Sequence, residues 1–305
     1  MRDRSTATAA TTAEPPAAVA DVTVVVPALD REDRVGAAVR SATSQVPPPA
    51  RVLVVDDGSE DATAARARAA GAEVLSAGPR GGSGPARNVG IASATTTWVA
   101  FLDSDDEWQP GHLAGLLARA GDHAMVTAPA LSSHGRWKGN STGRPARLNQ
   151  RGLLDPVSTV ITSGTMVRRD VLDAVGGFRD LRRAQDLDLW LRVLEQGSGL
   201  ALDVATVTYT EHAGQVSVDR ALMRAHFDDV LRLHADAAWM SEQLRRRSLV
   251  RWHWDDARSA VAARRPAKAL RAGGLLLRRP AQLTTLLRLL RQRRRERLIS
   301  SPPGG

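Results

Sequence analysis

The sequence predicts a doubly wound α/β fold, in which helices cover both faces of a mostly parallel sheet. Two observations support this class. Continuous apolar and β-branched runs alternate with helix-length segments along about the first hundred residues, and such runs are typical of strands that are buried on both faces. Each run also ends in a turn that contains Pro, Asp or Gly. In this fold a ligand binds beyond the carboxyl ends of the strands.

The first half of the chain has the clearest pattern. The expected strands are Val22 to Val26, Val52 to Val55, and Trp98 to Leu102. Helices are expected between and after them, and the first three have lengths that suit crossovers between parallel strands: Arg34 to Ala42, Ala62 to Ala70, Pro85 to Ala94, and Leu113 to Ala120.

The second half is less regular. Gly, Ser, Asn and Arg between Ser132 and Arg151 indicate a flexible loop. Two further strands are expected, at Thr159 to Val167 and Ala205 to Thr210, with a helix at Asp186 to Glu195 between them. From Asp219 onward we expect only helices, interrupted at Pro266 and Pro280.

Composition excludes several classes of protein. The 305 residues are 43% hydrophobic, enough for a full core, and no apolar run reaches the length of a membrane-spanning helix. Cysteine is absent, which excludes disulfides, thiolate metal sites and a thiol nucleophile. The first 20 residues have no apolar core of a signal peptide and are expected to be a disordered lead. A cytoplasmic location is therefore the default expectation.

The positive charge is concentrated near the C-terminus. Residues 241–305 contain 17 Lys and Arg against 4 Asp and Glu, whereas the whole chain has a formal net charge of +9. Helices in 244–298 could lie on an anionic membrane, at its inner face, or pack on the main domain, and the sequence leaves both open. No recognition motif indicates a specific nucleic-acid partner. We expect a lead (1–20), a main α/β domain (21–218) and a basic helical extension (219–305).

Aspartates follow each of the first three expected strands. They are Asp30, then Asp57, and then Asp103 with Asp105. Parallel strands would bring these carboxylates to one edge of the sheet, where their repulsion is costly unless a cation or hydrogen-bond donors lie between them. Mg²⁺ or Mn²⁺ is the natural occupant, because such hard cations prefer oxygen ligands. The alternative is that each aspartate only caps a helix or forms a turn.

Four motifs in this order and spacing carry a resemblance to a known family. They are Val22 to Asp30, Val54 to Ser59, Ala86 to Gly90, and Phe101 to Asp106. Together they resemble the nucleotide-sugar domain of the family 2 glycosyltransferases, which has the GT-A fold, and the resemblance covers residues 22–217. It implies a nucleoside-diphosphate sugar as donor and an acceptor hydroxyl as its partner in the reaction.

The resemblance also implies roles for individual residues. Pro27 and Leu29 match the turn that binds the nucleobase, Asp57 matches the residue that binds the edge of the base, and Arg87 lies close to it. Asp103 and Asp105 match the DxD motif, which holds the ribose and the divalent metal on the diphosphate. Leu29 stands where the family often has an aromatic residue and Asp30 where it often has Asn, so the nucleobase remains open.

Transfer to a hydroxyl requires a group that accepts its proton. Asp186 begins an amphipathic helix and matches the xED segment, whose Asp is the base in inverting members of the family; Gln185 replaces the usual Glu. Asp188 is the rival base. The alternative for Asp186 is a carboxylate that only stabilises a helix N-terminus.

Two further segments match the family, and two other residues have alternative roles. Gly176-Gly177-Phe178 resembles the loop before this helix, and Ser163-Gly164 resembles a strand on the acceptor side. Trp190 could be a core residue or a platform for a sugar. His212 could be a third metal ligand, contact the diphosphate, or lie at the surface.

The resulting hypothesis is an inverting, metal-dependent glycosyltransferase that works in polysaccharide or glycoconjugate biosynthesis, with Asp186 as general base. One rival is a sugar-1-phosphate nucleotidyltransferase, which would usually have a Gly-rich basic loop after the first strand; Pro27 to Arg31 lacks it. The other is a non-catalytic nucleotide-binding protein that associates with a membrane.

Overall fold

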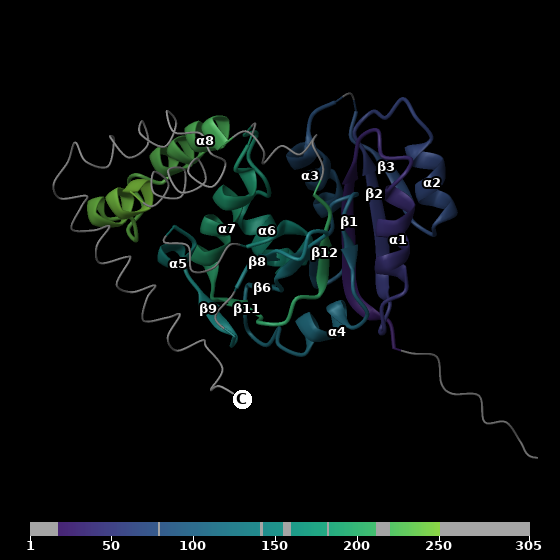
Figure 1. Cartoon of the computed structure of the whole chain (residues 1–305), viewed down its shortest axis with the longest axis horizontal. Helices are drawn as coiled ribbons and strands as arrows, with labels where there is room; N and C mark the ends of the chain where they lie inside the picture. The colour runs from purple at the N-terminus through teal and green to yellow at the C-terminus, as the bar shows by residue number, and fades with distance from the viewer. Residues whose placement is uncertain are drawn as a thin grey trace, which may run out of the picture.

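The computed structural model describes residues 18–78, 80–140, 143–154, 160–181, 183–211 and 220–250. Within them, an eight-stranded sheet has the order β3-β2-β1-β4-β10-β6-β11-β9, and a four-stranded sheet has the order β5-β12-β7-β8 (Figure 1). The predicted α/β class is confirmed. The strands are β1 (Ala20–Ala28), β2 (Pro49–Asp56), β3 (Glu73–Ser76), β4 (Trp98–Phe101), β5 (Glu107–Trp108), β6 (Met125–Thr127), β7 (Ala130–Ser132), β8 (Trp137–Lys138), β9 (Ala146–Leu148), β10 (Thr165–Arg168), β11 (Gly199–Ala201) and β12 (Val207–Tyr209).

The two halves of the large sheet are built differently. In the first half, strands β3, β2, β1 and β4 all run parallel to one another. Strand β10 is antiparallel to both β4 and β6, so the second half is mixed. The carboxyl ends of β1, β2 and β4 therefore meet at one edge, as the sequence predicts for parallel strands.

The core lies on both faces of the sheet. In β1, Val24 and Val26 pack into one cluster of buried residues while Val25 packs into the other, as the alternation of side chains along a strand requires. Helices α1 (Val35–Thr43), α2 (Thr63–Ala69) and α4 (His112–Leu117) contribute to the first cluster. The second includes residues from α3 (Ser83–Ser93), α5 (Gln150–Leu154), α6 (Arg169–Val175), α7 (Gln185–Gln196) and α8 (Arg220–Leu233).

Helix α3 approaches strand β1 closely at Gly90. A Cβ atom on Gly90 would lie 2.4 Å from Cγ1 of Val25, which is buried in the sheet. The absence of a side chain therefore sets the distance between the helix and the strand. This packing positions the start of α3, which lies at the edge of the sheet described below.

We expect the Gly90→Ala substitution to lower the free energy of unfolding by about 1 to 3 kcal/mol, because the new methyl group overpacks the core. Gly115→Ala is the matched control: Gly115 is also in a helix, and a Cβ there meets nothing within 4 Å. This control should be neutral or stabilise by about 0.5 to 1 kcal/mol. Urea unfolding of both variants measures the difference, and equal effects would contradict the packing argument.

Two expectations for the middle of the chain were wrong. The segment from Ser132 to Arg151, expected to be a loop, contains β8, β9 and the start of α5. The strand expected at Thr159 to Val167 begins only at Thr165, after a single 3-10 turn at Thr162–Gly164. Strands of two or three residues show no periodicity in the sequence, and pairing with distant strands stabilises them instead.

The basic extension begins as part of the main core. Phe227, Val230 and Leu231 of α8 are buried in the same cluster as Trp190 of α7, and further helical turns cover 242–250. In the part of the chain that is described, no helix has both the length and the apolar character to span a bilayer. Residues 1–17 and 251–305 lie outside it, and with them most of the expected lead and of the expected membrane-binding segment 244–298.

Candidate active site

A cavity of about 750 Å³ lies at the carboxyl ends of β1, β2 and β4. The loops that follow these strands and the start of α7 both contribute to its lining. Most of the residues singled out from the sequence reach it. Those on its wall include Pro27, Leu29, Asp30, Asp57, Arg87, Asp103, Asp105 and Asp186.

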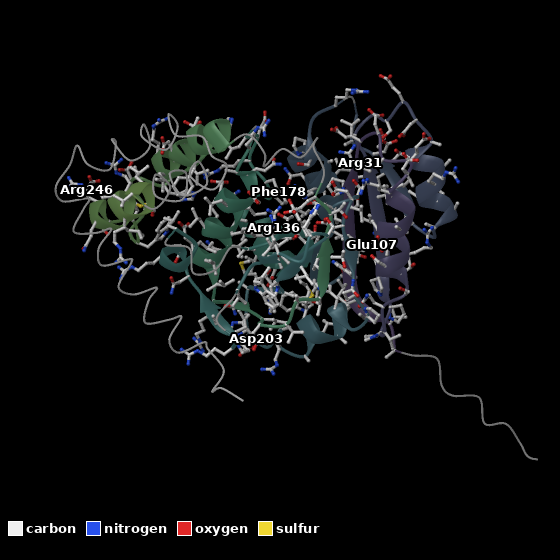
Figure 2. The ribbon with its side chains drawn as sticks, viewed as in Figure 1. Arg31, Glu107, Arg136, Phe178, Asp203 and Arg246 are labelled. Atoms are coloured by element: carbon white, nitrogen blue, oxygen red, sulfur yellow. The ribbon has the colours of Figure 1, made fainter. Side chains whose placement is uncertain are left out.

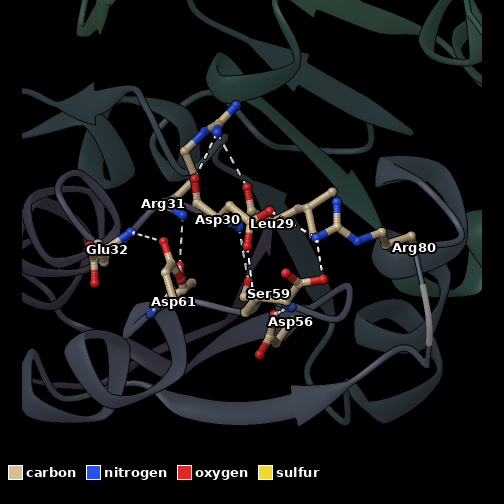
Figure 3. A network of polar contacts seen from close by, with 10 residues as sticks. Leu29, Asp30, Arg31, Glu32, Asp56, Ser59, Asp61 and Arg80 are labelled. Carbon is tan, nitrogen blue, oxygen red and sulfur yellow. Dashed lines mark hydrogen bonds and ion pairs between the residues drawn. The ribbon is translucent and has the colours of Figure 1, made fainter.

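A network of polar contacts joins the loops after β1 and β2 (Figure 3). The backbone N–H of Asp30 donates to Oγ of Ser59 at 3.0 Å, and the N–H of Glu60 donates to Oδ1 of Asp30 at 2.9 Å. Arg80 donates to Oδ2 of Asp30 at 3.2 Å, which ties in the loop after β3. These reciprocal bonds hold three loops as one wall of the cavity.

Asp57 organises the loop at the start of α3. It is buried, and its two carboxylate oxygens accept hydrogen bonds from the N–H groups of Gly81 at 2.7 Å and Gly82 at 2.8 Å. Backbone donors that would otherwise be unpaired at a helix N-terminus are satisfied in this way. Asp57 thus lies on the cavity wall with both oxygens already engaged, and further contacts must use their remaining lone pairs.

Arg87 and Asp103 form an ion pair across the base of the cavity. Nη2 of Arg87 lies 2.5 Å from Oδ1 of Asp103, and the arginine side chain is only 7% exposed, whereas that of Asp103 is 32% exposed. The guanidinium also lies 5.3 Å from the ring centroid of Phe178, as in a cation–π contact. The arginine therefore holds one oxygen of the first DxD carboxylate in place.

The Asp103–Asp106 turn alternates between cavity and core. Asp103 and Asp105 are half-buried and line the cavity, while Asp106 is buried. Oγ of Ser163 accepts from the N–H of Asp103 at 3.1 Å and donates to Oδ2 of Asp106 at 2.5 Å. Burial, together with the charge of Asp103, raises the pKa of Asp106 to about 8. A raised pKa lessens the negative charge that Asp106 adds beside the pair that faces the cavity.

A divalent metal in the cavity would need oxygen ligands from the side chains around it. Among the described residues, no group of three or more His, Cys, Asp and Glu side chains is arranged to hold a metal. Asp103 and Asp105 nevertheless provide two carboxylates on one wall of the cavity. Mg²⁺ is commonly bound by one or two carboxylates together with substrate phosphates and waters, so this pair fits a metal that arrives with a diphosphate.

Asp186 faces the cavity from the first turn of α7. Its Oδ1 accepts a hydrogen bond from the N–H of Leu187 at 2.8 Å. Burial raises the pKa of the Asp186 carboxyl above its usual value, although that hydrogen bond and the charge of Arg87 act in the opposite direction. A carboxylate with a raised pKa is a stronger base than an ordinary aspartate.

Asp188, the rival base, does not reach the cavity. Its side chain is fully buried, and its oxygens accept hydrogen bonds from Arg179, Arg192 and His234 at 2.7 to 3.0 Å. Burial alone would raise its pKa, but the hydrogen bonds from His234 and Arg192 and the charges of Arg192 and Arg179 hold the pKa of Asp188 below its usual value. The structure thus separates the two carboxylates: one lines the cavity and the other anchors the helix.

The remaining predicted residues have mixed outcomes. Trp190 is 1% exposed and packs against Phe101 and Phe178, so it is a core residue. Ser163 and Gly164, expected in a strand, lie in the 3-10 turn, where Gly164 passes so close to Ala128 that a Cβ would meet its carbonyl oxygen at 2.3 Å. His212 lies outside the described residues.

Several cavity residues were missed by the sequence reasoning. Arg80, Arg183 and Tyr209 line the cavity, and Gln185 donates from Nε2 to Oγ of Ser83 at 2.7 Å, which joins the starts of α7 and α3. Arg80 follows β3, a four-residue strand without a clear apolar pattern. Gln185 was singled out in the sequence as a departure from its motif, and only its contact with Ser83 was not predicted.

The family model for glycosyl transferase family 2 matches residues 23–176. The chain belongs to this family. Among curated relatives, this glycosyltransferase is 32% identical to the succinoglycan biosynthesis protein ExoU of Rhizobium meliloti over 60% of its own length and 59% of that protein. It is 34% identical to an uncharacterized glycosyltransferase of Mycobacterium bovis, over 58% of its own length and 80% of that protein.

Solved structures agree on the fold of the glycosyltransferase. The structure of S. aureus TarS residues 1–349 in complex with UDP-GlcNAc superposes with a TM-score of 0.63 at 19% identity, covering 82% of this chain and 79% of that one. The expected GT-A type of fold is thereby confirmed. The chain spans less than two thirds of the length of ExoU and of a second succinoglycan biosynthesis protein, ExoO.

Proposed function

We propose that this protein transfers a sugar from a nucleoside-diphosphate sugar to an acceptor hydroxyl, in one displacement that inverts the anomeric centre. One observation carries the proposal: a single cavity has the Asp103 and Asp105 carboxylates on one wall and the Asp186 carboxylate at the start of α7. Such a cavity suits a donor whose diphosphate lies against the DxD pair and whose sugar lies in front of the base. The family of the chain supports the same reaction class.

The donor would lie along the wall formed by the loops after β1 and β2. Pro27 and Leu29 offer apolar contact to the nucleobase, and Asp57 offers the remaining acceptor capacity of its buried carboxylate. Asp103, with one oxygen held by Arg87, is in a position to bind the ribose. The solved TarS structures include complexes with UDP-GlcNAc and with UDP, which makes a uridine nucleotide the first donor to test.

Asp103 and Asp105 would hold a divalent metal, Mg²⁺ or Mn²⁺, together with the diphosphate oxygens. When bound, such a metal stabilises the charge that develops on the leaving diphosphate. The basic side chains of Arg80 and Arg183 also line the cavity, where their charges favour an anionic ligand.

Asp186 would act as general base. Its carboxylate accepts the proton of the acceptor hydroxyl while that oxygen forms a bond to the anomeric carbon and the bond from this carbon to the diphosphate breaks. Because attack comes from the side opposite the diphosphate, the configuration inverts. The raised pKa suits a base that must be ionised near neutral pH and still hold a proton in the transition state.

The acceptor is proposed to be a growing polysaccharide or glycoconjugate. Two relatives are named succinoglycan biosynthesis proteins, and another is named as a glucosyltransferase that acts on a GlcNAc-diphosphoundecaprenol. A location at the inner face of the cytoplasmic membrane would fit a lipid-linked acceptor, and the basic residues of 244–298 could contact anionic lipids there.

Calorimetry tests the donor site directly. We expect UDP, GDP or dTDP to bind to the protein, and Mn²⁺ to raise the affinity by about tenfold or more, since the pair of carboxylates and the diphosphate share the cation. The Asp105→Asn substitution should remove most of this gain. Asp122→Asn, which changes an exposed aspartate in the turn after α4, is the control. If Mn²⁺ does not change the affinity of the native protein for the nucleoside diphosphate, the DxD assignment is contradicted.

Product analysis separates the two rivals. A screen of nucleotide sugars by mass spectrometry should reveal release of a nucleoside diphosphate and a new glycoside or free sugar. A sugar-1-phosphate nucleotidyltransferase would instead release pyrophosphate from a nucleoside triphosphate. Tight nucleotide binding without turnover of any donor would favour a non-catalytic protein.

A further inference from the structure

The buried carboxylate of Asp188 joins three segments of the chain: α7 itself, the loop before it and the region after α8. Its Oδ1 accepts hydrogen bonds from Nη1 of Arg179 at 2.9 Å and from Nε2 of His234 at 3.0 Å. Its Oδ2 accepts from Nε of Arg192 at 3.0 Å and from Nη2 at 2.7 Å. The carboxylate has no exposed surface, so these donors replace all of its contact with water.

Arg192 extends the cluster to the segment before α7. Its Nη1 donates to the carbonyl oxygen of Val175 at 2.6 Å, and its Nη2 donates to that of Gly177 at 2.8 Å. Both carbonyls belong to the end of α6 and the turn that follows it. Asp188 and Arg192 therefore fix α7 relative to α6 from inside the core.

His234 brings the region after α8 into the same cluster. It is 5% exposed and stacks on Trp239 with ring centroids 5.5 Å apart. Nε1 of Trp239 donates in turn to Oε1 of Glu195, near the other end of α7, at 2.7 Å. The segment 234–239 thus contacts α7 at two points, Asp188 and Glu195. The first of these lies in the same helical turn as Asp186.

The first turn of α7 has one further side-chain hydrogen bond, from Gln185 to Ser83 of α3. It follows Ala184, whose backbone has a φ of 54° in the left-handed region, and this residue provides no side-chain cap. Of the two donors to Oδ1 of Asp188, Arg179 is 47% exposed and long, so its bond is weaker and more easily broken by water. The contact of His234 is the buried one, and without it one side of the carboxylate would lose its fixed partner.

We propose that His234 is a positioning residue for the transfer reaction: through Asp188 it sets the direction of the first turn of α7, and with it the placement of the Asp186 carboxylate in the cavity. The inference rests on the proposed role of Asp186 as base. The segment after α8 would then affect the rate of transfer. The wall proposed to bind the donor is formed by the loops after β1 and β2, so it does not depend on the His234 contact.

The test compares variants of His234 in the full-length protein. His234→Leu should lower kcat by about tenfold or more, since a shift of about 1 Å in a catalytic group can cost up to about a hundredfold. The KM for the donor and the Kd for the nucleoside diphosphate should change by less than about twofold, because the donor wall is unaffected. His234→Gln should recover most of kcat, because its amide N–H can reach the place of Nε2.

Two further variants serve as controls for folding and for the helix itself. His234→Asn has the same amide as the Gln variant, but its shorter side chain does not reach Asp188. It should therefore behave like the Leu variant. If the Leu variant does not fold, the Asn and Gln variants are compared instead. His226→Leu changes a histidine within α8 whose acidic partner is Asp229 and not Asp188. It should leave kcat unchanged.

A double substitution distinguishes positioning from general damage. If His234 acts through Asp186, His234→Leu should cause no further loss of rate in an Asp186→Asn background. An unchanged kcat in His234→Leu, or an equal further loss in that background, would overturn the inference alone. A full transfer rate in Asp186→Asn itself would overturn both the inference and the proposed base.

Discussion

The Asp186→Asn variant should bind the donor nucleotide normally but transfer the sugar about 100- to 10,000-fold more slowly, the range expected when a general base is removed. Asparagine keeps the size of the side chain and can still accept the hydrogen bond from the N–H of Leu187. It cannot take the proton of the acceptor hydroxyl. The loss should therefore appear in kcat, with the affinity for nucleoside diphosphate changed by less than about twofold.

The pH dependence of transfer provides a second readout. Since the pKa of Asp186 is raised by burial, the rate of the native enzyme should fall as the pH drops through a value above that of an ordinary aspartate. The Asn variant should lose this acidic limb from its residual rate. Asp173→Asn, at an exposed ion pair on α6, is the control and should match the native enzyme. A full rate in the Asp186 variant would remove this residue as the base.

The stability of the protein should fall steeply in mild acid because of His112. This histidine is 1% exposed, its Nδ1 lies 2.7 Å from Oγ1 of Thr206, and its Nε2 has no hydrogen-bond partner among the described residues. Burial lowers its pKa from 6.5 to about 3. Between pH 6.5 and about 3, this histidine is protonated in the unfolded chain but not in the folded chain. Its contribution to the free energy of unfolding is therefore fully present above pH 6.5 and is lost as the pH falls toward 3.

The size of this effect follows from the shift in pKa. At about 1.4 kcal/mol for each pH unit, the loss would approach about 5 kcal/mol at pH 3, a large part of the stability of a typical domain. Urea unfolding at several pH values measures the slope. His112→Asn keeps a polar group near Nδ1 for Thr206 but cannot titrate, so its unfolding free energy should depend less on pH across this range.

His123 offers a matched control for this measurement. Its Nδ1 also lies 2.7 Å from a hydroxyl, that of Ser198, but its side chain is only half-buried. His123→Asn exchanges the same two residue types at a less buried site, so it controls for the substitution itself. If His112→Asn has the same slope as the native protein, the buried neutral histidine is not the cause of acid lability.

The parallel half of the sheet was predictable because its strands are long and apolar. Strand β1 is buried along almost its entire length, and its continuous valine run can be identified without any knowledge of its neighbours. The mixed half of the large sheet and the small sheet were largely missed, since strands such as β11 and β8 have two or three residues. Their conformation depends on pairing with β7 and β6, which are distant or equally short.

The candidate site was predicted in its residues but not in its contacts. Placement of aspartates after parallel strands was enough to expect Asp57, Asp103 and Asp105 at one edge. Nothing in the spacing showed that Asp57 would bind two backbone N–H groups, or that Ser163 would link Asp103 to Asp106. Each of these contacts joins segments whose approach in space follows only from the folded sheet.

By itself, the sequence determined the α/β class, the edge of the sheet where a ligand belongs, and the carboxylates that gather there, because hydrophobic runs and the turns after them are local properties. Only the tertiary structure separated Asp186, which lines the cavity, from Asp188, which is buried, although the two stand two positions apart in one helix. The physical reason is that the surroundings of a carboxylate depend on which donors folding brings to it. For Asp188 those donors include His234, which is far away in the chain and close only after folding.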